Sequence, residues 1–185
     1  MKTLIFNESN LQEKDIDEIV TRVKVFLVNN KNELNYAISN GGVQLPGGHV
    51  ESGEEYIETV KREIKEEVGI GLEDEEISKP FFEIKHFTKN YSNSNKNRIS
   101  NVLYYLVRTD KEVNKENTAL TDNEKKNKFT MQKMDCNLFE DYLKNKIAEE
   151  NIEINKIIEK EILIAYEELK NAISRIFIFY NFIYF

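Results

Sequence analysis

The segment from Gly48 to Ile70 (GHVESGEEYIETVKREIKEEVGI) constrains the fold more than any other part of the chain. It fits the pattern Gly-x5-Glu-x7-Arg-Glu-aliphatic-x-Glu-Glu-x-Gly-aliphatic at every specified position. Background residue frequencies give such a match odds on the order of 10⁻⁸ at one starting point. Chance therefore does not explain the segment, and its residues have to be interpreted together.

Residues 52–70 carry the local signals of one amphipathic helix. The small and acidic residues at 52–55 predict the helix start, since they offer acceptors to first-turn amides and negative charge to the helix dipole. Gly69 predicts the helix end. An apolar stripe at helical spacing predicts one buried face, formed by Ile57, Val60, Ile64 and Val68.

Three carboxylates lie beside that apolar stripe, at Glu63, Glu66 and Glu67. Carboxylates at this spacing repel one another unless a cation lies among them, and magnesium favours carboxylate and carbonyl oxygens. Gly47 and Gly48 precede the helix and let backbone groups approach a ligand closely. The pattern therefore predicts a Mg²⁺ site, with Mn²⁺ as an alternative ion. The competing interpretation is an ordinary solvated face of a Glu/Lys-rich helix.

The segment resembles the signature of the Nudix hydrolases, pyrophosphatases that act on a nucleoside diphosphate linked to another moiety. The resemblance implies an α/β/α sandwich in which the signature forms a loop–helix–loop against a mixed sheet. It implies that Glu63, Glu66 and Glu67, with a backbone carbonyl near Gly48, hold one to three magnesium ions. It also implies that Glu54 and Arg62 form a structural pair, as they do in the family.

Several residues outside the signature are further candidates. Arg22 begins a predicted strand at a place where family members often reach a substrate phosphate, although a solvated surface arginine is the alternative. Glu124 is the candidate for a further metal-binding or water-activating carboxylate, with Glu112 and Glu116 as rivals. The general base is then either Glu63 or Glu124. His49 faces a phosphate or lies exposed in its loop.

Composition limits the class of protein. The 26 basic and 33 acidic residues give a net charge of −7, which argues against a general nucleic-acid-binding surface. The single Cys136 cannot form an internal disulfide, so a reducing compartment is expected. We find no signal-peptide pattern and no apolar run of the roughly 18 residues that a membrane span needs. A soluble cytoplasmic protein is the expectation.

The remaining patterns predict one Nudix-like domain over residues 22–147. An edge strand and an irregular connection over 1–21 precede it, and a helix with an aromatic tail over 148–185 follows. Alternating apolar residues predict a hairpin of strands 22–28 and 34–38 joined by residues 29–32, and the polar segment 110–127 is predicted to be a long mobile loop. The other predicted elements are strands at 3–6, 43–45, 80–87, 98–108 and 129–134 and helices beginning at 137 and near 154.

The predicted C-terminal helices could cap the sheet or pair between two subunits of a homodimer. The last ten residues, Ile176–Phe185, are apolar or aromatic except for Asn181. They are too short to span a bilayer. Four interpretations of this tail stay open. It could form a helix in a hydrophobic interface, an added edge strand or a membrane-surface segment, or it could be an aggregation-prone segment without a role that results from the reading frame.

The predicted function is Mg²⁺-dependent hydrolysis of a phosphoanhydride bond in a nucleotide or nucleoside-diphosphate derivative. A catalytically inactive, ligand-sensing Nudix fold is the alternative. An isoprenoid-diphosphate isomerase, a fold relative, needs a catalytic cysteine, and Cys136 lies in the wrong region of the chain. Subfamily markers for ADP-ribose and dinucleoside polyphosphates are absent, because residues 84–88 read Ile-Lys-His-Phe-Thr. The sequence does not name the substrate.

Overall fold

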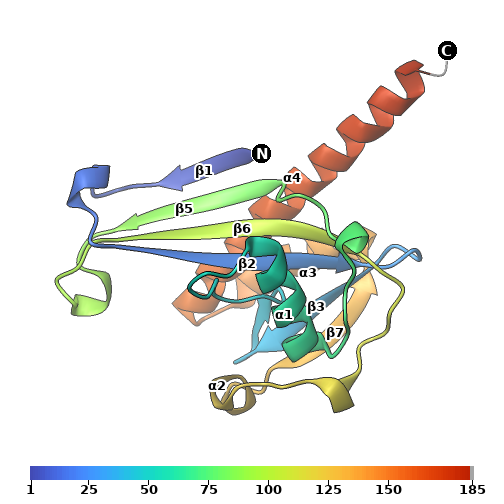
Figure 1. Ribbon diagram of the computed structural model, residues 1–185, viewed down its shortest axis with the longest axis horizontal. Coiled ribbons are helices and arrows are strands. Elements are labelled where there is room, and N and C mark those ends of the chain that lie inside the picture. Colours follow the sequence, from blue (N-terminus) through green and yellow to red (C-terminus); the bar gives the residue numbers. More distant parts are fainter. Residues whose placement is uncertain (184–185) are drawn as a thin grey trace.

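The computed structural model describes residues 1–183, and side chains as far as Ser174. Helices cover both faces of a mixed seven-stranded sheet (Figure 1), the α/β/α layering that the sequence predicts. The strands are β1 (Lys2–Phe6), β2 (Glu18–Val28), β3 (Glu33–Ser39), β4 (Gly42–Gln44), β5 (Phe82–Thr88), β6 (Arg98–Arg108) and β7 (Thr130–Asp135). The α-helices are α1 (Tyr56–Val68), α2 (Asp122–Lys126), α3 (Cys136–Glu149) and α4 (Glu153–Ile183). Single 3₁₀ turns lie at Glu13–Asp15, Asp74–Glu76, Tyr91–Asn93 and Lys115–Asn117.

The sheet has the strand order β1-β5-β6-β2-β3-β4, and β7 also pairs with β3. The β1/β5 and β2/β6 pairs are parallel, whereas β2/β3, β3/β4, β3/β7 and β5/β6 are antiparallel. The predicted edge strand is confirmed as β1, and the predicted hairpin as β2 and β3 joined by residues 29–32. The central strand β2 lies beside the loop that precedes the signature helix, because its Val23 and Val25 amides donate to the Gly48 and Pro46 carbonyls of that loop.

Side chains of β2 alternate between two cores, one on each face of the sheet. Val23, Val25 and Leu27 are buried against α1, whose predicted apolar stripe provides Val60, Ile64 and Val68. Glu55 precedes α1 and its amide donates to the Glu58 carboxylate at 2.9 Å, while Gly69 ends the helix with φ +79°. The predicted helix and its buried face are confirmed.

The opposite face of the sheet is covered by α3 and α4. Phe26 and Val28 of β2 lie in a core with Phe139 of α3 and with Tyr166 and Leu169 of α4. The Tyr166 hydroxyl also donates to the carbonyl of Cys136 at 2.6 Å. Of the two predicted roles for the C-terminal helices, the structure therefore shows the capping of the sheet.

Two predicted segments differ from the structure in a way that has a clear physical reason. Strand β2 begins at Glu18 rather than at residue 22, because it pairs in parallel with β6 along its whole length, from Glu18 beside Arg98 to Val28 beside Arg108. Segment 110–127 is not wholly irregular, since it contains α2. The Thr121 hydroxyl accepts from the Glu124 amide at 3.3 Å and the Thr121 amide donates to the Glu124 carboxylate at 2.6 Å, a capping box that starts this short helix.

Helix α4 runs past the end of the sheet toward the C-terminus (Figure 1). Within residues 1–183, no helix combines the length and the apolar character needed to cross a membrane. The predictions for the aromatic tail, 176–185, fall on residues whose side chains lie outside the described part of the chain.

Candidate active site

The loop from Leu45 to Gly48, called the glycine loop below, lies directly against strand β2. Its Pro46 carbonyl accepts from the Val25 amide at 3.0 Å, and its Gly48 carbonyl accepts from the Val23 amide at 2.9 Å. Gly47 has φ +124°, and a Cβ at this position would lie 2.3 Å from the Val23 carbonyl oxygen. Only glycine fits here, because both the backbone conformation and the close approach exclude a side chain.

Glu67 connects this loop to α1. Its side chain is 6% exposed, and its Oε2 accepts a hydrogen bond from the Gly47 amide at 2.7 Å. Burial raises the pKa of Glu67, and the neighbouring carboxylates Glu63 and Glu124 raise it further, whereas Lys24 and the Gly47 amide oppose the shift. A buried carboxylate with this environment is suited to binding a cation.

Arg62 holds the other signature carboxylates. It donates to Glu54 from Nε at 2.9 Å, and from Nη1 to Glu63 at 2.7 Å and to Glu66 at 3.3 Å. The structural pair of Glu54 and Arg62 is thereby confirmed. Burial raises the pKa of the Glu63 carboxyl, although Arg62 lowers it in part, and a Cβ on Gly48 would lie 2.4 Å from Glu63 Oε1.

Replacing Glu54 with glutamine should lower the free energy of unfolding by about 1–2 kcal/mol at pH 7, since Glu54 accepts charge-assisted hydrogen bonds from Arg62 and a 2.7 Å bond from Thr59 Oγ1. These bonds, with Arg62 first, lower the pKa of Glu54 to about 2. Because the pKa of Glu54 is lower in the folded state than in the unfolded state, its ionised carboxylate stabilises the fold at pH values above the unfolded-state pKa. This contribution should therefore fade as the pH falls from about 4.5 toward 2. Urea unfolding of both proteins at pH 7 and pH 3 measures it, and an equal difference at both pH values would contradict the assignment.

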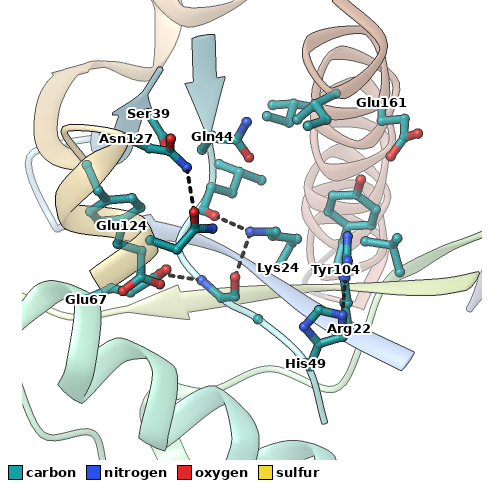
Figure 2. Close-up of a pocket in the computed structure, with 18 residues that line it drawn as sticks. Arg22, Lys24, Ser39, Gln44, His49, Glu67, Tyr104, Glu124, Asn127 and Glu161 are labelled. Atoms are coloured by element: carbon teal, nitrogen blue, oxygen red, sulfur yellow. Dashed lines mark hydrogen bonds between the residues drawn. The ribbon is translucent and has the colours of Figure 1, made fainter. Parts of the chain in front are cut away.

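A cavity of about 250 Å³ opens beside the glycine loop. It brings together six of the residues predicted from the sequence, namely Arg22, Gly47, Gly48, His49, Glu67 and Glu124. Figure 2 labels Arg22, His49, Glu67 and Glu124 among them. The same cavity is lined by Lys24, Ser39, Gln44, Leu45, Val102, Tyr104, Asn123, Asn127, Phe129, Ile158, Glu161 and Ile162. Glu63 and Glu66 do not line the cavity, because hydrogen bonds from Arg62 hold their carboxylates beside it.

Basic groups face the carboxylates across the cavity. Arg22 Nε donates to His49 Nε2 at 2.9 Å, which requires this imidazole nitrogen to be unprotonated. Burial lowers the pKa of His49, and the Arg22 charge lowers it further. Lys24 Nζ donates to the carbonyls of Leu45 at 2.9 Å and Gly47 at 2.6 Å. The cavity therefore has an acidic wall and a basic wall.

Lys24 was not predicted from the sequence as a residue of the cavity. Neither were the three residues that α4 contributes to it, Ile158, Glu161 and Ile162. The signal for Lys24 is its position on the face of β2 that carries Phe26 and Val28, where a charged side chain among buried apolar ones is unexpected. No local signal identifies the α4 residues, because their helix packs onto the sheet from more than 100 residues away in the sequence.

The rival carboxylates Glu112 and Glu116 line a different surface cavity, where Glu112 pairs with Lys133 at 3.3 Å. Cys136 likewise lines another cavity, with Arg108 and Tyr166. In the described part of the chain, no three side chains of Asp, Glu, His or Cys are grouped so that they could hold a metal ion by themselves. A cation at the candidate site would also need oxygen ligands from the backbone, water or substrate.

The comparison with protein families decides the identity of the fold. A family model described as NUDIX domain matches residues 18–147. The chain belongs to the Nudix family. The glycine loop and α1 lie within the matched residues, as do all the residues that line the cavity except Ile158, Glu161 and Ile162 of α4. No curated protein matches the chain.

Solved structures of other proteins resemble the chain at low sequence identity. DR0079 from Deinococcus radiodurans is 20% identical, with a TM-score of 0.46, over 76% of this chain and 81% of that protein. A MutT protein from Bacillus halodurans is 19% identical, with a TM-score of 0.46, over 66% and 72%. A MutT Nudix hydrolase from Burkholderia pseudomallei is 20% identical, with a TM-score of 0.46, over 64% and 84%.

Proposed function

We propose that this Nudix domain hydrolyses a phosphoanhydride bond of a nucleoside triphosphate or nucleoside-diphosphate derivative with the help of Mg²⁺. The observation that carries the proposal is a cavity in which the signature residues Gly48 and Glu67 and the preceding Gly47 meet Glu124 and Arg22. Carboxylates on one wall suit a hard cation, and a guanidinium on the other suits a phosphate.

The donor groups fit a divalent cation. Burial raises the pKa of both Glu63 and Glu67, so a positive charge among these carboxylates would relieve an unfavourable burial of negative charge. The Gly47 carbonyl already accepts from a cationic group, Lys24. Magnesium retains several water or phosphate ligands, so two or three protein oxygens suffice. Mn²⁺ prefers the same carboxylate and carbonyl ligands.

The residues in and beside the cavity then have distinct roles. Arg22 binds a phosphate oxygen, and Glu67 and Glu63 bind the cation, with Glu66 beside them. Bound Mg²⁺ would neutralise charge on the phosphate oxygens and activate water. The Gly47 and Gly48 backbone lies close to the reacting phosphate. The inner wall, with Tyr104, Phe129 and Ile162, offers apolar surface for the nucleoside.

Glu124 is the better supported of the two candidates for the general base. It lines the cavity and lies close enough to Glu67 to influence the pKa of that carboxyl, whereas Glu63 is held by Arg62 outside the cavity wall. A general base has to lie within hydrogen-bonding distance of the attacking water, so the position of a carboxylate is considered before its pKa.

Replacing Glu124 with glutamine should therefore lower kcat by about 100-fold or more, with a small change in KM. Glutamine retains an acceptor for the Thr121 amide, so α2 should keep its start. The matched control is Glu116→Gln, which removes an exposed carboxylate away from the cavity and should leave kcat within about twofold. Steady-state kinetics of the three proteins measures the effect, and equal kcat values would move the base to Glu63.

The proposal as a whole is tested by a screen at millimolar Mg²⁺ in which the products are separated and identified. The panel covers nucleoside triphosphates including oxidised ones, dinucleoside polyphosphates, nucleotide sugars and NADH. We expect Mg²⁺-dependent cleavage of at least one class, with two phosphorylated products. If no substrate of the panel is cleaved, the result would favour the inactive, ligand-sensing alternative. If a substrate is converted to an isomer, the result would favour isomerase chemistry.

A further inference from the structure

Lys24 is a charged side chain on the face of β2 that also carries Arg22 at the cavity and two apolar residues toward the end of the strand. It lies on the same side of the strand as Phe26 and Val28, both of which are buried in the core beneath α3 and α4. A partly buried ammonium group loses hydration and needs hydrogen-bond acceptors. Lys24 finds them in the glycine loop, at the carbonyls of Leu45 and Gly47.

Both acceptors are neutral backbone oxygens rather than a carboxylate. An ammonium group has three donors, and two of them are directed at this loop, at 2.9 Å and 2.6 Å. Carbonyl oxygens are also ligands for hard divalent cations. The Leu45 and Gly47 carbonyls thus bind the cationic end of Lys24 with the same chemistry that a metal ion would use.

Gly47 is held between a cation and an anion. Its amide donates to the Glu67 carboxylate at 2.7 Å, and its carbonyl accepts from Lys24 at 2.6 Å (Figure 2). The neighbouring Gly48 carbonyl instead accepts from the Val23 amide at 2.9 Å, within the backbone pairing of the loop with β2. The Gly47 carbonyl therefore faces a charged group of the cavity, as the Leu45 carbonyl does, and Gly47 is the residue of the two that also contacts Glu67.

Four charged groups lie near the Lys24 ammonium. Glu67 and Glu63 come from α1, Glu124 from α2 and Arg22 from β2 itself. The three carboxylates attract any cation into this region, and the tethered ammonium is one cation that already lies there. A divalent ion that binds Glu67 and the Gly47 carbonyl would meet this positive charge at short range.

We propose that Lys24 is a tethered competitor of the divalent cation, whose ammonium group has to leave the Gly47 carbonyl before the metal ion can bind that oxygen. The inference rests on the proposed metal-dependent function. It predicts that the affinity for the metal alone is limited by this lysine.

Mn²⁺ binding in the absence of nucleotide tests the inference, measured by electron paramagnetic resonance of free Mn²⁺ at pH 7. Lys24→Met keeps an unbranched side chain that is one atom shorter and removes its charge, so we expect Mn²⁺ to bind about tenfold more tightly than to the wild type. The matched control is Lys65→Met, which removes an exposed positive charge from α1 and should change the affinity less than about twofold. Glu67→Gln should abolish binding.

Four outcomes decide the matter. Tighter binding by Lys24→Met, or binding by this variant where the wild type shows none, supports the competition. If Lys24→Met binds Mn²⁺ no more tightly than the wild type, and Glu67→Gln does not bind it, the competition is overturned but the metal site is supported. No binding by any protein overturns both this inference and the metal dependence of the proposed function. If Lys24→Met does not fold, Lys24→Gln, which retains an N–H donor, takes its place under the same criteria.

Discussion

Replacing Glu67 with glutamine should abolish hydrolysis, with a loss of roughly 10³-fold or more in kcat, which corresponds to about 4 kcal/mol of activation free energy. The carboxylate provides the charge that binds the cation, and a neutral amide does not. The fold should survive because glutamine keeps an oxygen that accepts from the Gly47 amide. Kinetics at saturating Mg²⁺ and thermal unfolding without metal measure the two effects separately.

The matched control for this variant is Glu58→Gln, which removes an exposed carboxylate from the same helix. Glu58 accepts from the Glu55 amide at the helix start, so its loss should cost only a few tenths of a kcal/mol to about 1 kcal/mol of stability and leave kcat unchanged. Activity of Glu67→Gln within tenfold of the wild type would remove Glu67 from the cation site.

Replacing Gly47 with alanine should lower the free energy of unfolding by about 3 kcal/mol and eliminate activity. The new Cβ would lie 2.3 Å from the Val23 carbonyl oxygen, so the loop would have to move away from β2. That movement breaks the contacts of Gly47 with both Glu67 and Lys24. The cost combines backbone strain at positive φ with a steric clash against rigid backbone.

Gly41 provides the comparison, since its φ is +80° and nothing lies within 4 Å of a Cβ added there. Gly41→Ala should cost about 1 kcal/mol, the strain of positive φ alone, and should leave activity intact. Urea unfolding and kinetics of both variants give the result. Equal costs at the two glycines would show that the close approach to Val23 is not what requires Gly47.

The sequence predicts best those elements whose signals are local. Helix α1 follows from the acidic start, the apolar stripe and Gly69, all within the signature itself. The pairing of Glu54 with Arg62 lies within the same segment and is confirmed. Helix α2 was missed although Thr121 and Glu124 form a capping box, because a helix of five residues has no apolar periodicity to reveal it.

Features that depend on distant segments were not predictable. Strand β2 begins at Glu18 because β6 offers a partner along its whole length, beginning at Arg98, which also forms an ion pair with Glu18 at 2.9 Å. The environment of Lys24 depends on the approach of a loop some twenty residues away and on the cover that α4 provides. No pattern around Lys24 encodes either contact. The roles of Glu63, Glu66, Glu67 and Glu124 stay predictions that the proposed variants address.

The proposed function requires that the cavity beside Gly47 cleave a phosphoanhydride bond with the help of a divalent cation. The most direct measurement is ³¹P NMR of one sample, containing the protein and the substrate class found in the screen, before and after Mg²⁺ is added. We expect no change before Mg²⁺ is added. Afterwards we expect the anhydride resonance to disappear and two phosphorylated products to form, in the wild type but not in Glu67→Gln. Cleavage that needs no metal, or that continues unchanged in Glu67→Gln, would contradict it.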